Sequence, residues 1–300
     1  MIMKCPEEMR AEVIKAGKVP VLVVKRKDSA KKGPGVLWIH GGGYMTGMKE
    51  MVYISRAMDL VRDLDAVVFS PGYRLSFQAP YPAAAEDCYQ TLLFMKENAD
   101  RFGFRSDQIM AGGESAGGGL CAAVCMMARD RKDVNIAFQM PLYPMMDQND
   151  TETSADNHGR IWNTKKNHLG WRSYLRDDYG REVSPHASPA SQTDYSGLPP
   201  AYTFVSDGEP FLAETKTYIR NLKAAGIPAE IDIYPGNMHA FDMLDPKSCV
   251  SRTAVNRFRE AVRKAAELYF CPQADELSRQ QTADYDKHKG GTGDDENTIS

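Results

Sequence analysis

Apolar runs of strand length alternate with segments of helical periodicity along most of this 300-residue chain. Strands that alternate with helices in this way form a mostly parallel sheet that helices cover on both faces. The predicted strands cover residues 19–25, 35–40, 66–73, 107–115, 136–144, 201–207 and 229–236. The predicted helices cover residues 54–64, 82–103, 116–131, 213–226 and about 252–269. We therefore expect an α/β fold.

Two stretches break the alternation. Residues 145–198 form a long polar insertion that contains two of the three tryptophans, Trp162 and Trp171. An insertion of this length inside an α/β domain indicates a cap over a ligand site. Residues 272–300 are polar, rich in glycine and short of apolar anchors, so we expect a loosely ordered tail there. Residues 1–271 then form a single domain.

Composition argues against several classes of partner. The formal net charge is −3, which gives no basis for binding nucleic acid or an anionic membrane surface. No stretch approaches the roughly 18 apolar residues of a transmembrane helix, and the first residues lack the apolar core of a signal peptide. The six cysteines form no CxxC pair, which favours reduced thiols and a cytoplasmic location over a metal site.

A G-x-S-x-G pattern occurs at residues 113–117, between a predicted strand and a predicted helix. A sharp turn at this place needs small neighbours and exposes the Ser115 hydroxyl at the carboxyl end of the sheet, where open α/β sheets bind ligands. The first N–H groups of the following helix point at the same spot. The pattern by itself fits a glycine-rich turn without a catalytic role equally well.

A second glycine-rich stretch, HGGGY at residues 40–44, directly follows the predicted strand 35–40. Three consecutive glycines leave backbone N–H groups unobstructed, so the loop can direct two donors at a developing oxyanion. A phosphate-binding loop is the competing interpretation, but no Lys-Ser/Thr follows and the dinucleotide spacing is missing. We expect His40 to shape this loop rather than to act as a base.

Together the two motifs resemble those of the hormone-sensitive-lipase-like branch of the α/β-hydrolase fold, in particular bacterial carboxylesterases and acetyl esterases. The segments PGYRLSFQAPYPAAAEDCYQTLLFMKENADRFG, SGLPPAYTFVSDGEPF and LKAAGIPAEIDIYPGNMHAF resemble the same family, so the resemblance covers about residues 19–270. It implies an α/β-hydrolase fold with a small cap. It also implies that the N–H groups of Gly42, Gly43 and Ala116 form an oxyanion hole.

A serine nucleophile needs a base, and in this fold the chain order is serine, acid, histidine. His239 follows a late predicted strand and is the histidine in the right place. For the acid we favour Glu209 over Asp207, because Glu209 stands before Pro and Phe where the family usually has Asp-Pro and an apolar residue. Glu114 precedes the nucleophile where the family often has Asp, and we expect it to stabilise the turn by accepting N–H bonds.

The resemblance implies a serine carboxylesterase that hydrolyses small esters with acetyl to butyryl groups, including acetylated sugars, and needs no metal or organic cofactor. The pocket is predicted to be edged by Tyr44, Tyr73, Trp162 and Phe211. About 18 residues precede the first predicted strand. That is fewer than the family's helical N-terminal cap, and implies a cleft that is more open or closed by a partner subunit in a homo-oligomer.

Two other functions stay open at this point. One is a non-catalytic ligand receptor built on the same fold, as in the plant gibberellin receptors, although those lose the histidine that His239 represents here. The other is a peptidase or amidase that uses the same three residues, although peptidases of this fold usually carry an additional domain.

Overall fold

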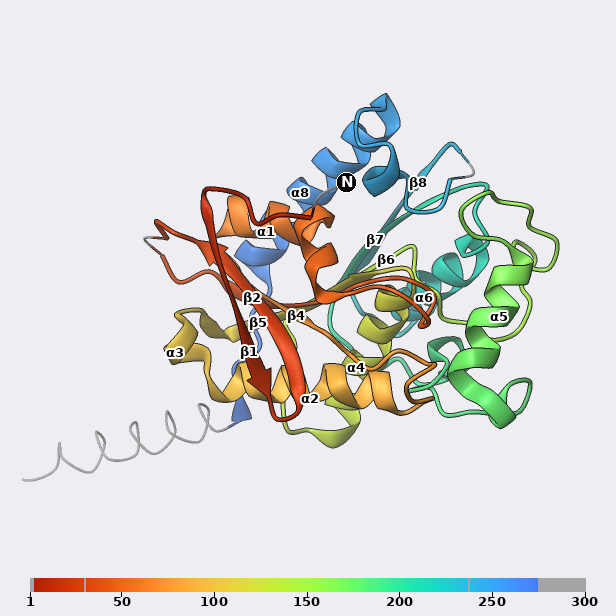
Figure 1. The fold of residues 1–300 in the computed structure, drawn as a ribbon, viewed down its shortest axis with the longest axis horizontal. Helices are drawn as coiled ribbons and strands as arrows, with labels where there is room; N and C mark the ends of the chain where they lie inside the picture. Colours follow the sequence, from red (N-terminus) through yellow and green to blue (C-terminus); the bar gives the residue numbers. More distant parts are fainter. Residues whose placement is uncertain (1–2, 30, 237, 275–300) are drawn as a thin grey trace, which may run out of the picture.

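The computed structural model describes residues 3–29, 31–236 and 238–274, which form a three-layered α/β fold (Figure 1). Its described strands form one sheet in the order β1-β2-β4-β3-β5-β6-β7-β8. They are β1 (Met9–Ala16), β2 (Val19–Arg26), β3 (Pro34–Ile39), β4 (Val67–Pro71), β5 (Arg105–Glu114), β6 (Phe138–Leu142), β7 (Ala201–Ser206) and β8 (Ala229–Tyr234). Strand β2 pairs antiparallel with β1 and β4, whereas the neighbours from β4 to β8 pair parallel. This confirms the predicted mostly parallel sheet.

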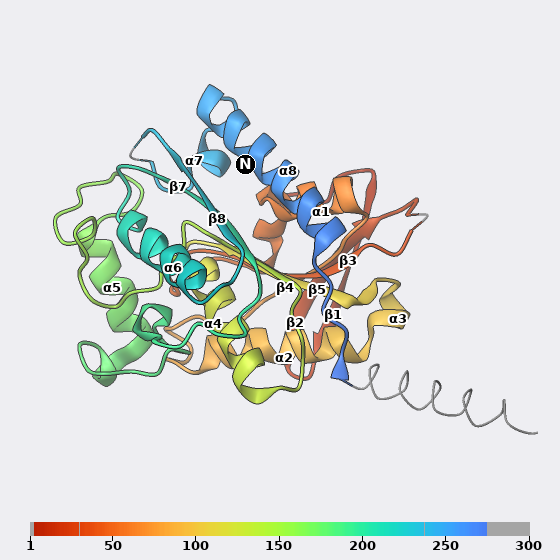
Figure 2. The same cartoon turned by 180° about the vertical axis from the view of Figure 1, so that it is seen from behind.

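Helices cover both faces of the sheet, as the views from opposite sides show (Figures 1 and 2). One face packs against α1 (Ala57–Leu64) and α8 (Cys249–Leu268). The other packs against α2 (Ala83–Glu97), α3 (Ala99–Phe102), α4 (Ala116–Arg131) and α6 (Leu212–Ala224). Successive strand residues point to opposite faces, so Leu37 and Trp38 of β3 enter different hydrophobic clusters. Each face of the sheet therefore has its own core.

Two elements differ from the sequence prediction. Strand β1 begins at Met9, so the expectation that about 18 residues precede the first strand is wrong. Only the two end residues of this edge strand are buried, which leaves its apolar pattern too weak to recognise. The predicted helix 82–103 is divided into α2 and α3 at Asn98, whose N–H donates to the carbonyl groups of Phe94 and Met95.

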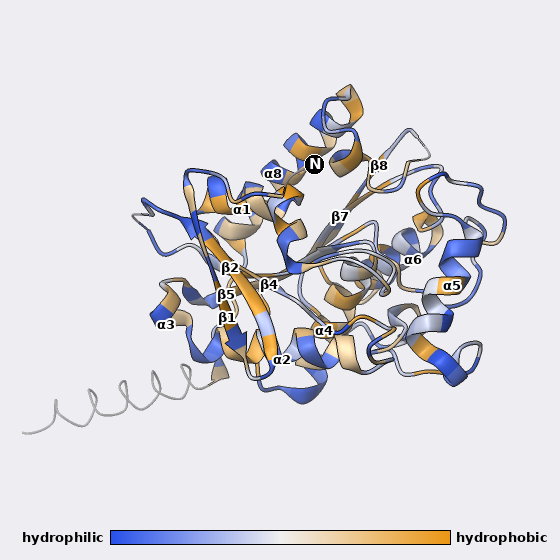
Figure 3. Ribbon diagram, in the orientation of Figure 1, coloured by the Kyte–Doolittle hydropathy of each residue, from blue (hydrophilic) through white to orange (hydrophobic). Residues whose placement is uncertain are grey.

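The long insertion lies between β6 and β7 and contains one helix, α5 (Thr164–Leu175), with the short 3₁₀ turns η2 (Arg176–Asp178) and η3 (Pro189–Ser191). Two further short elements, η1 (Lys49–Ile54) and α7 (Phe241–Leu244), lie outside it. Figure 3 shows that α5 is mostly hydrophilic, whereas β2 in the sheet is largely hydrophobic. The insertion begins at the carboxyl end of β6 and is anchored in the core by Trp171, Tyr174 and Leu175 of α5.

The C-terminal end is better anchored than predicted at residues 272–274. The Gln273 side chain is buried, donates to the Ser106 carbonyl at 2.9 Å and accepts from the Asn135 N–H at 2.9 Å. These contacts explain why the first residues of the predicted tail are packed, while residues 275–300 lie outside the described part. No helix in that described part combines the length and hydropathy needed to cross a bilayer.

Candidate active site

Ser115 occupies the sharp turn between β5 and α4. Its backbone has φ 58° and ψ −121°, a conformation that side chains rarely adopt. The Ser115 N–H donates to the Leu142 carbonyl at 3.0 Å, which fixes the turn to the end of β6. A Cβ atom on Gly117 would lie 2.0 Å from the Ile39 carbonyl oxygen, so only glycine fits there. These distances confirm the predicted close approach of the backbone to itself.

The glycine-rich loop after β3 lies directly against this turn. A Cβ atom on Gly41 would be 3.2 Å from the Ser115 Cβ and 2.8 Å from the Glu114 carbonyl oxygen. Gly42 and Gly43 have φ values of 121° and 61°, which favour glycine. The loop and the first turn of α4, which begins at Ala116, therefore converge on the serine.

His40 is buried at the start of this loop. Its Nδ1 atom lies 2.8 Å from the Gly41 carbonyl oxygen, and its ring stacks on Tyr73 at a centroid distance of 4.3 Å. Burial lowers the pKa of His40 to about 4, so its imidazole is neutral at physiological pH. The residue lies where the sequence analysis predicted, in a position to shape the loop.

His239 connects Ser115 to a carboxylate. The ring lies in the segment between β8 and α7, with Nε2 2.8 Å from the Ser115 Oγ and Nδ1 2.6 Å from the Glu209 Oε2. All three residues are buried: Ser115 is 6% exposed, His239 4% and Glu209 1%. Because Ser115, Glu209 and His239 each follow a parallel strand, the carboxyl ends of β5, β7 and β8 bring them together. This arrangement can activate a serine hydroxyl.

The two candidate acids have different surroundings. Burial raises the pKa of the Glu209 carboxyl, and the adjacent His239 opposes that rise. Asp207 is exposed, and its Oδ1 accepts the Gly236 N–H at 2.9 Å. In this geometry Glu209 faces the imidazole, whereas Asp207 holds the neighbouring turn.

Of the four predicted pocket residues, two lie beside the histidine. The centroids of Trp162 and Phe211 are 6.4 and 5.1 Å from that of His239. Phe211 is fully buried, and Trp162 is partly buried, with its ring against Gly43. Trp162 therefore brings the insertion into the site.

The other two, Tyr44 and Tyr73, are buried in the hydrophobic core, and neither ring contacts that of His239 among the aromatic pairs of the described residues. The Tyr44 hydroxyl donates to the Met145 carbonyl at 2.8 Å, and its ring stacks on Tyr174. The Tyr73 hydroxyl donates to the His40 carbonyl at 2.9 Å. The Tyr73 hydroxyl therefore holds the start of the glycine-rich loop, and the Tyr44 hydroxyl ties the end of that loop to the segment after β6.

Comparison with known proteins identifies the family of this fold. Residues 36–243 match a family described as having the alpha/beta hydrolase fold. The chain belongs to this family. Within it, the chain is 31% identical over 255 residues to the carboxylic ester hydrolase LipN of Mycobacterium tuberculosis, covering 83% of this chain and 67% of that protein. It is 26% identical to the ethyl acetate hydrolase of Pseudomonas putida, covering 71% and 68% of the two chains.

The fold of this chain is similar to that of several solved esterase structures. The structure of a bacterial heroin esterase superposes with a TM-score of 0.82 at 29% identity, covering 87% of this chain and 85% of that chain. These relatives place the chain in the hormone-sensitive-lipase-like branch that its motifs resemble. The residues described in this alpha/beta hydrolase contain no group of three or more His, Cys, Asp or Glu side chains suited to a metal ion.

A buried polar network that the sequence analysis did not find lies beneath the histidine. Asp242 accepts from the Tyr143 hydroxyl at 2.9 Å and is ion-paired with Arg56 at 3.1 Å. The Tyr143 ring packs edge-on against His239 at a centroid distance of 5.2 Å. No periodicity or motif marks these three residues, because they come from separate segments that only the fold brings together.

Glu114 adjoins this network. Both of its carboxylate oxygens accept from the Trp38 indole N–H, at 2.9 and 3.0 Å. Burial, and then the nearby charge of Asp242, raise the pKa of Glu114 to about 8. Its position next to Ser115 supports the predicted role in stabilising the turn, although the N–H group that it accepts from belongs to the Trp38 indole rather than to the backbone.

Proposed function

We propose that the protein, like its relatives named as carboxylic ester hydrolases, is a serine carboxylesterase with Ser115 as nucleophile, His239 as base and Glu209 as the acid that orients it. The observation that carries this proposal is the continuous contact from Ser115 Oγ through both ring nitrogens of His239 to Glu209 Oε2. A non-catalytic receptor would not require a histidine aligned between a strained serine and a buried carboxylate in order to bind its ligand.

The reaction follows from these contacts. Ser115 Oγ attacks the ester carbonyl carbon while its proton passes to Nε2 of His239. The N–H groups of Gly42, Gly43 and Ala116 stabilise the oxyanion, and the Glu209 carboxylate holds the Nδ1–H of the imidazolium. When the tetrahedral intermediate collapses, the C–O bond to the alcohol breaks and His239 gives its proton to the leaving oxygen. Water then attacks the acyl group on Ser115 by the same steps and releases the acid.

For the substrate, we propose esters of acetyl to butyryl groups, with acetylated sugars as one class of alcohol. Trp162 and Phe211 stand beside His239, and we expect the partly exposed ring of Trp162 to limit the length of the acyl chain. The name of the ethyl acetate hydrolase from Pseudomonas putida gives a short-chain acetyl ester as that relative's substrate. A formal net charge of −3 is compatible with a small uncharged substrate.

We further propose that residues 145–198 act as the cap of a single domain formed by residues 1–271. The insertion supports this role by placing Trp162 against Gly43 of the glycine-rich loop. Six free cysteines favour a reducing, cytoplasmic location.

The test is a series of p-nitrophenyl esters from acetate to decanoate, assayed with the purified protein and with Ser115→Ala. We expect the highest kcat/KM at acetate to butyrate, and loss of turnover in the variant. Acetylated xylo-oligosaccharides test the sugar esters, and a peptide p-nitroanilide tests the amidase alternative. Equal turnover by Ser115→Ala would remove this serine from the mechanism, and a preference for decanoate would contradict the short-chain assignment.

A further inference from the structure

The loop that carries the acid is anchored on one side by the segment leading to the histidine. Residues 207–211 connect β7 to α6, and the carboxylate of Glu209 reaches His239 from the middle of this loop. The Gly208 N–H donates to the Gly236 carbonyl at 2.8 Å. The Gly236 N–H in turn donates to Asp207. These bonds fix the beginning of the loop. The backbone on either side of Glu209 forms further bonds with another segment.

The insertion between β6 and β7 supplies these bonds. The Thr153 hydroxyl donates to the Pro210 carbonyl at 2.8 Å. The Asn157 side-chain N–H donates to the Gly208 carbonyl at 3.2 Å. The two bonds meet the backbone immediately before and immediately after Glu209.

Thr153 also completes the start of α6. The N-cap residue of this helix is Phe211, whose side chain makes no capping hydrogen bond. The first N–H groups of a helix have no partner within the helix. The Thr153 hydroxyl accepts the Ala213 N–H at 3.1 Å, so it supplies from another segment the cap that phenylalanine cannot provide. One hydroxyl therefore joins the acid loop to the helix that follows it.

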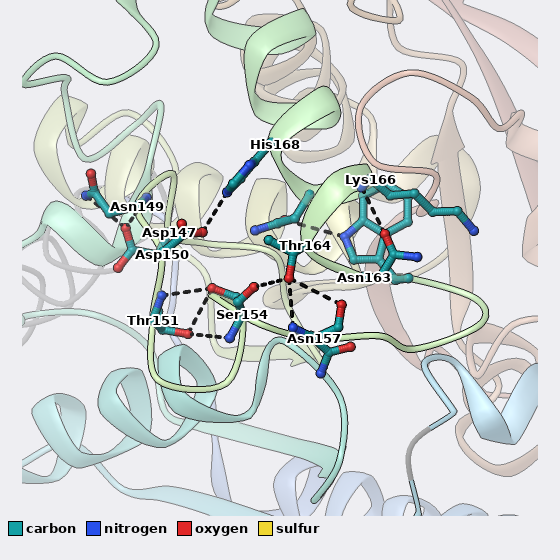
Figure 4. Close-up of polar contacts among 12 residues, drawn as sticks. Asp147, Asn149, Asp150, Thr151, Ser154, Asn157, Asn163, Thr164, Lys166 and His168 are labelled. Carbon is teal, nitrogen blue, oxygen red and sulfur yellow. Dashed lines mark hydrogen bonds and ion pairs between the residues drawn. The ribbon is translucent and has the colours of Figure 1, made fainter.

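Hydrogen bonds cross-link the part of the insertion that contains Thr153 and Asn157, and Figure 4 shows those among Thr151, Ser154, Asn157 and Thr164. The Thr164 hydroxyl donates to the Ser154 carbonyl at 2.6 Å and accepts the Asn157 N–H at 2.8 Å. The Thr151 hydroxyl and backbone both bond to Ser154. We call residues 151–164 the cap loop. Its cross-links close it into a compact unit that also contains Trp162.

We propose that Thr153 and Asn157 of the cap loop are positioning residues for Glu209. They fix the backbone on both sides of Glu209, so that its carboxylate stays at Nδ1 of His239. A glutamate has one more rotatable bond than aspartate, so its carboxylate depends more strongly on a fixed backbone. Because the cap loop also carries Trp162, it links the wall of the substrate site to the placement of the acid. This inference rests on the proposed role of Glu209.

The test compares Thr153→Val, which keeps the shape but removes the hydroxyl, with Thr153→Ser, which keeps the hydroxyl. For p-nitrophenyl acetate we expect kcat to fall about tenfold in Thr153→Val, as expected for the loss of about one or two hydrogen bonds, with a smaller change in KM. Thr153→Ser should restore most of kcat, and Asn157→Ala should lower it less. The control is Thr193→Val, an exposed position in the same insertion whose backbone N–H bonds Gln192. Denaturant unfolding of each variant checks that it is folded.

Combination with Glu209→Gln distinguishes positioning from a general effect on structure. If Thr153 acts through Glu209, Thr153→Val should lower kcat no further in the Glu209→Gln background. The same tenfold fall in both backgrounds would overturn the inference, as would a fully active Thr153→Val or a Thr153→Ser as impaired as Thr153→Val. Full turnover by Glu209→Gln would overturn the role of Glu209 and this inference together. An impaired Glu209→Gln beside a fully active Thr153→Val would overturn this inference alone.

Discussion

Glu209 Oε2 lies 2.6 Å from Nδ1 of His239, and this short contact links the end of β7 to the segment after β8. Asp207 stands two positions earlier but bonds the Gly236 N–H instead. The two carboxylates that follow β7 therefore have different roles in the structure. The buried one faces the imidazole, and the exposed one holds a turn.

The first prediction concerns these two carboxylates. Glu209→Gln should lower kcat for p-nitrophenyl acetate by roughly 10²–10⁴-fold, because an amide cannot stabilise the imidazolium or hold the correct tautomer. Asp207→Asn should stay within about twofold of the unmodified protein, as expected for an exposed site. Steady-state kinetics of both variants measures the difference. A larger loss in Asp207→Asn would assign the acid to Asp207.

Trp162 gives a prediction about acyl length. Replacement by alanine removes the ring that lies against Gly43 and beside His239. We expect the ratio of kcat/KM for octanoate to that for acetate to rise roughly tenfold, since a few methylene contacts account for such a factor. The matched control is Leu169→Ala, which changes an exposed residue of α5. An unchanged ratio in Trp162→Ala would mean that this ring does not limit the acyl chain.

Glu114 predicts a pH dependence of stability. Its pKa is raised from an ordinary value of 4.5 to about 8, mainly by burial, so the folded protein keeps a proton that the unfolded chain releases between these values. The stability associated with this group is complete below about pH 4.5 and is lost as pH rises towards about pH 8. Glutamine at this position cannot ionise and can still accept a hydrogen bond from Trp38. The Glu114→Gln variant should therefore lack the fall in the free energy of unfolding that ionisation of Glu114 causes.

The measurement is the free energy of unfolding from urea titrations between pH 5 and pH 8. The decline with pH should be shallower in Glu114→Gln than in the unmodified protein. Glu86→Gln serves as the control, because Glu86 is on the surface and ion-paired with Arg131. Parallel curves for the unmodified protein and Glu114→Gln would show that Glu114 does not hold its proton in the folded state.

Much of the fold could be predicted from the sequence because its signals are local. The segments that form β3 and β7 are largely apolar runs of strand length, and α4 occupies the predicted range 116–131. Glycine patterns located the turn at Ser115 and the loop after β3, because segments whose backbones approach closely require glycine in the sequence. Strand β1 left no such mark, since most of its side chains face solvent.

The surroundings of the candidate site were harder to predict because they depend on contacts between distant segments. Tyr44 and Tyr73 each follow a strand, but nothing in the sequence shows that their hydroxyl groups bond the carbonyl groups of Met145 and His40. The pairing of Asp242 with Tyr143 and Arg56 has no sequence signature. The same holds for Thr153, whose partner Pro210 lies 57 positions away.

The central claim is that Ser115 forms a covalent acyl intermediate with His239 as its base. The most direct measurement is mass spectrometry of the protein after treatment with a p-nitrophenyl alkylphosphonate, which transfers one phosphonyl group to an activated serine and releases p-nitrophenol. We predict a single adduct on the peptide that contains Ser115, strongly reduced in His239→Ala and absent in Ser115→Ala. Labelling at another residue with loss of esterase activity, or full activity after complete modification of Ser115, would contradict the account.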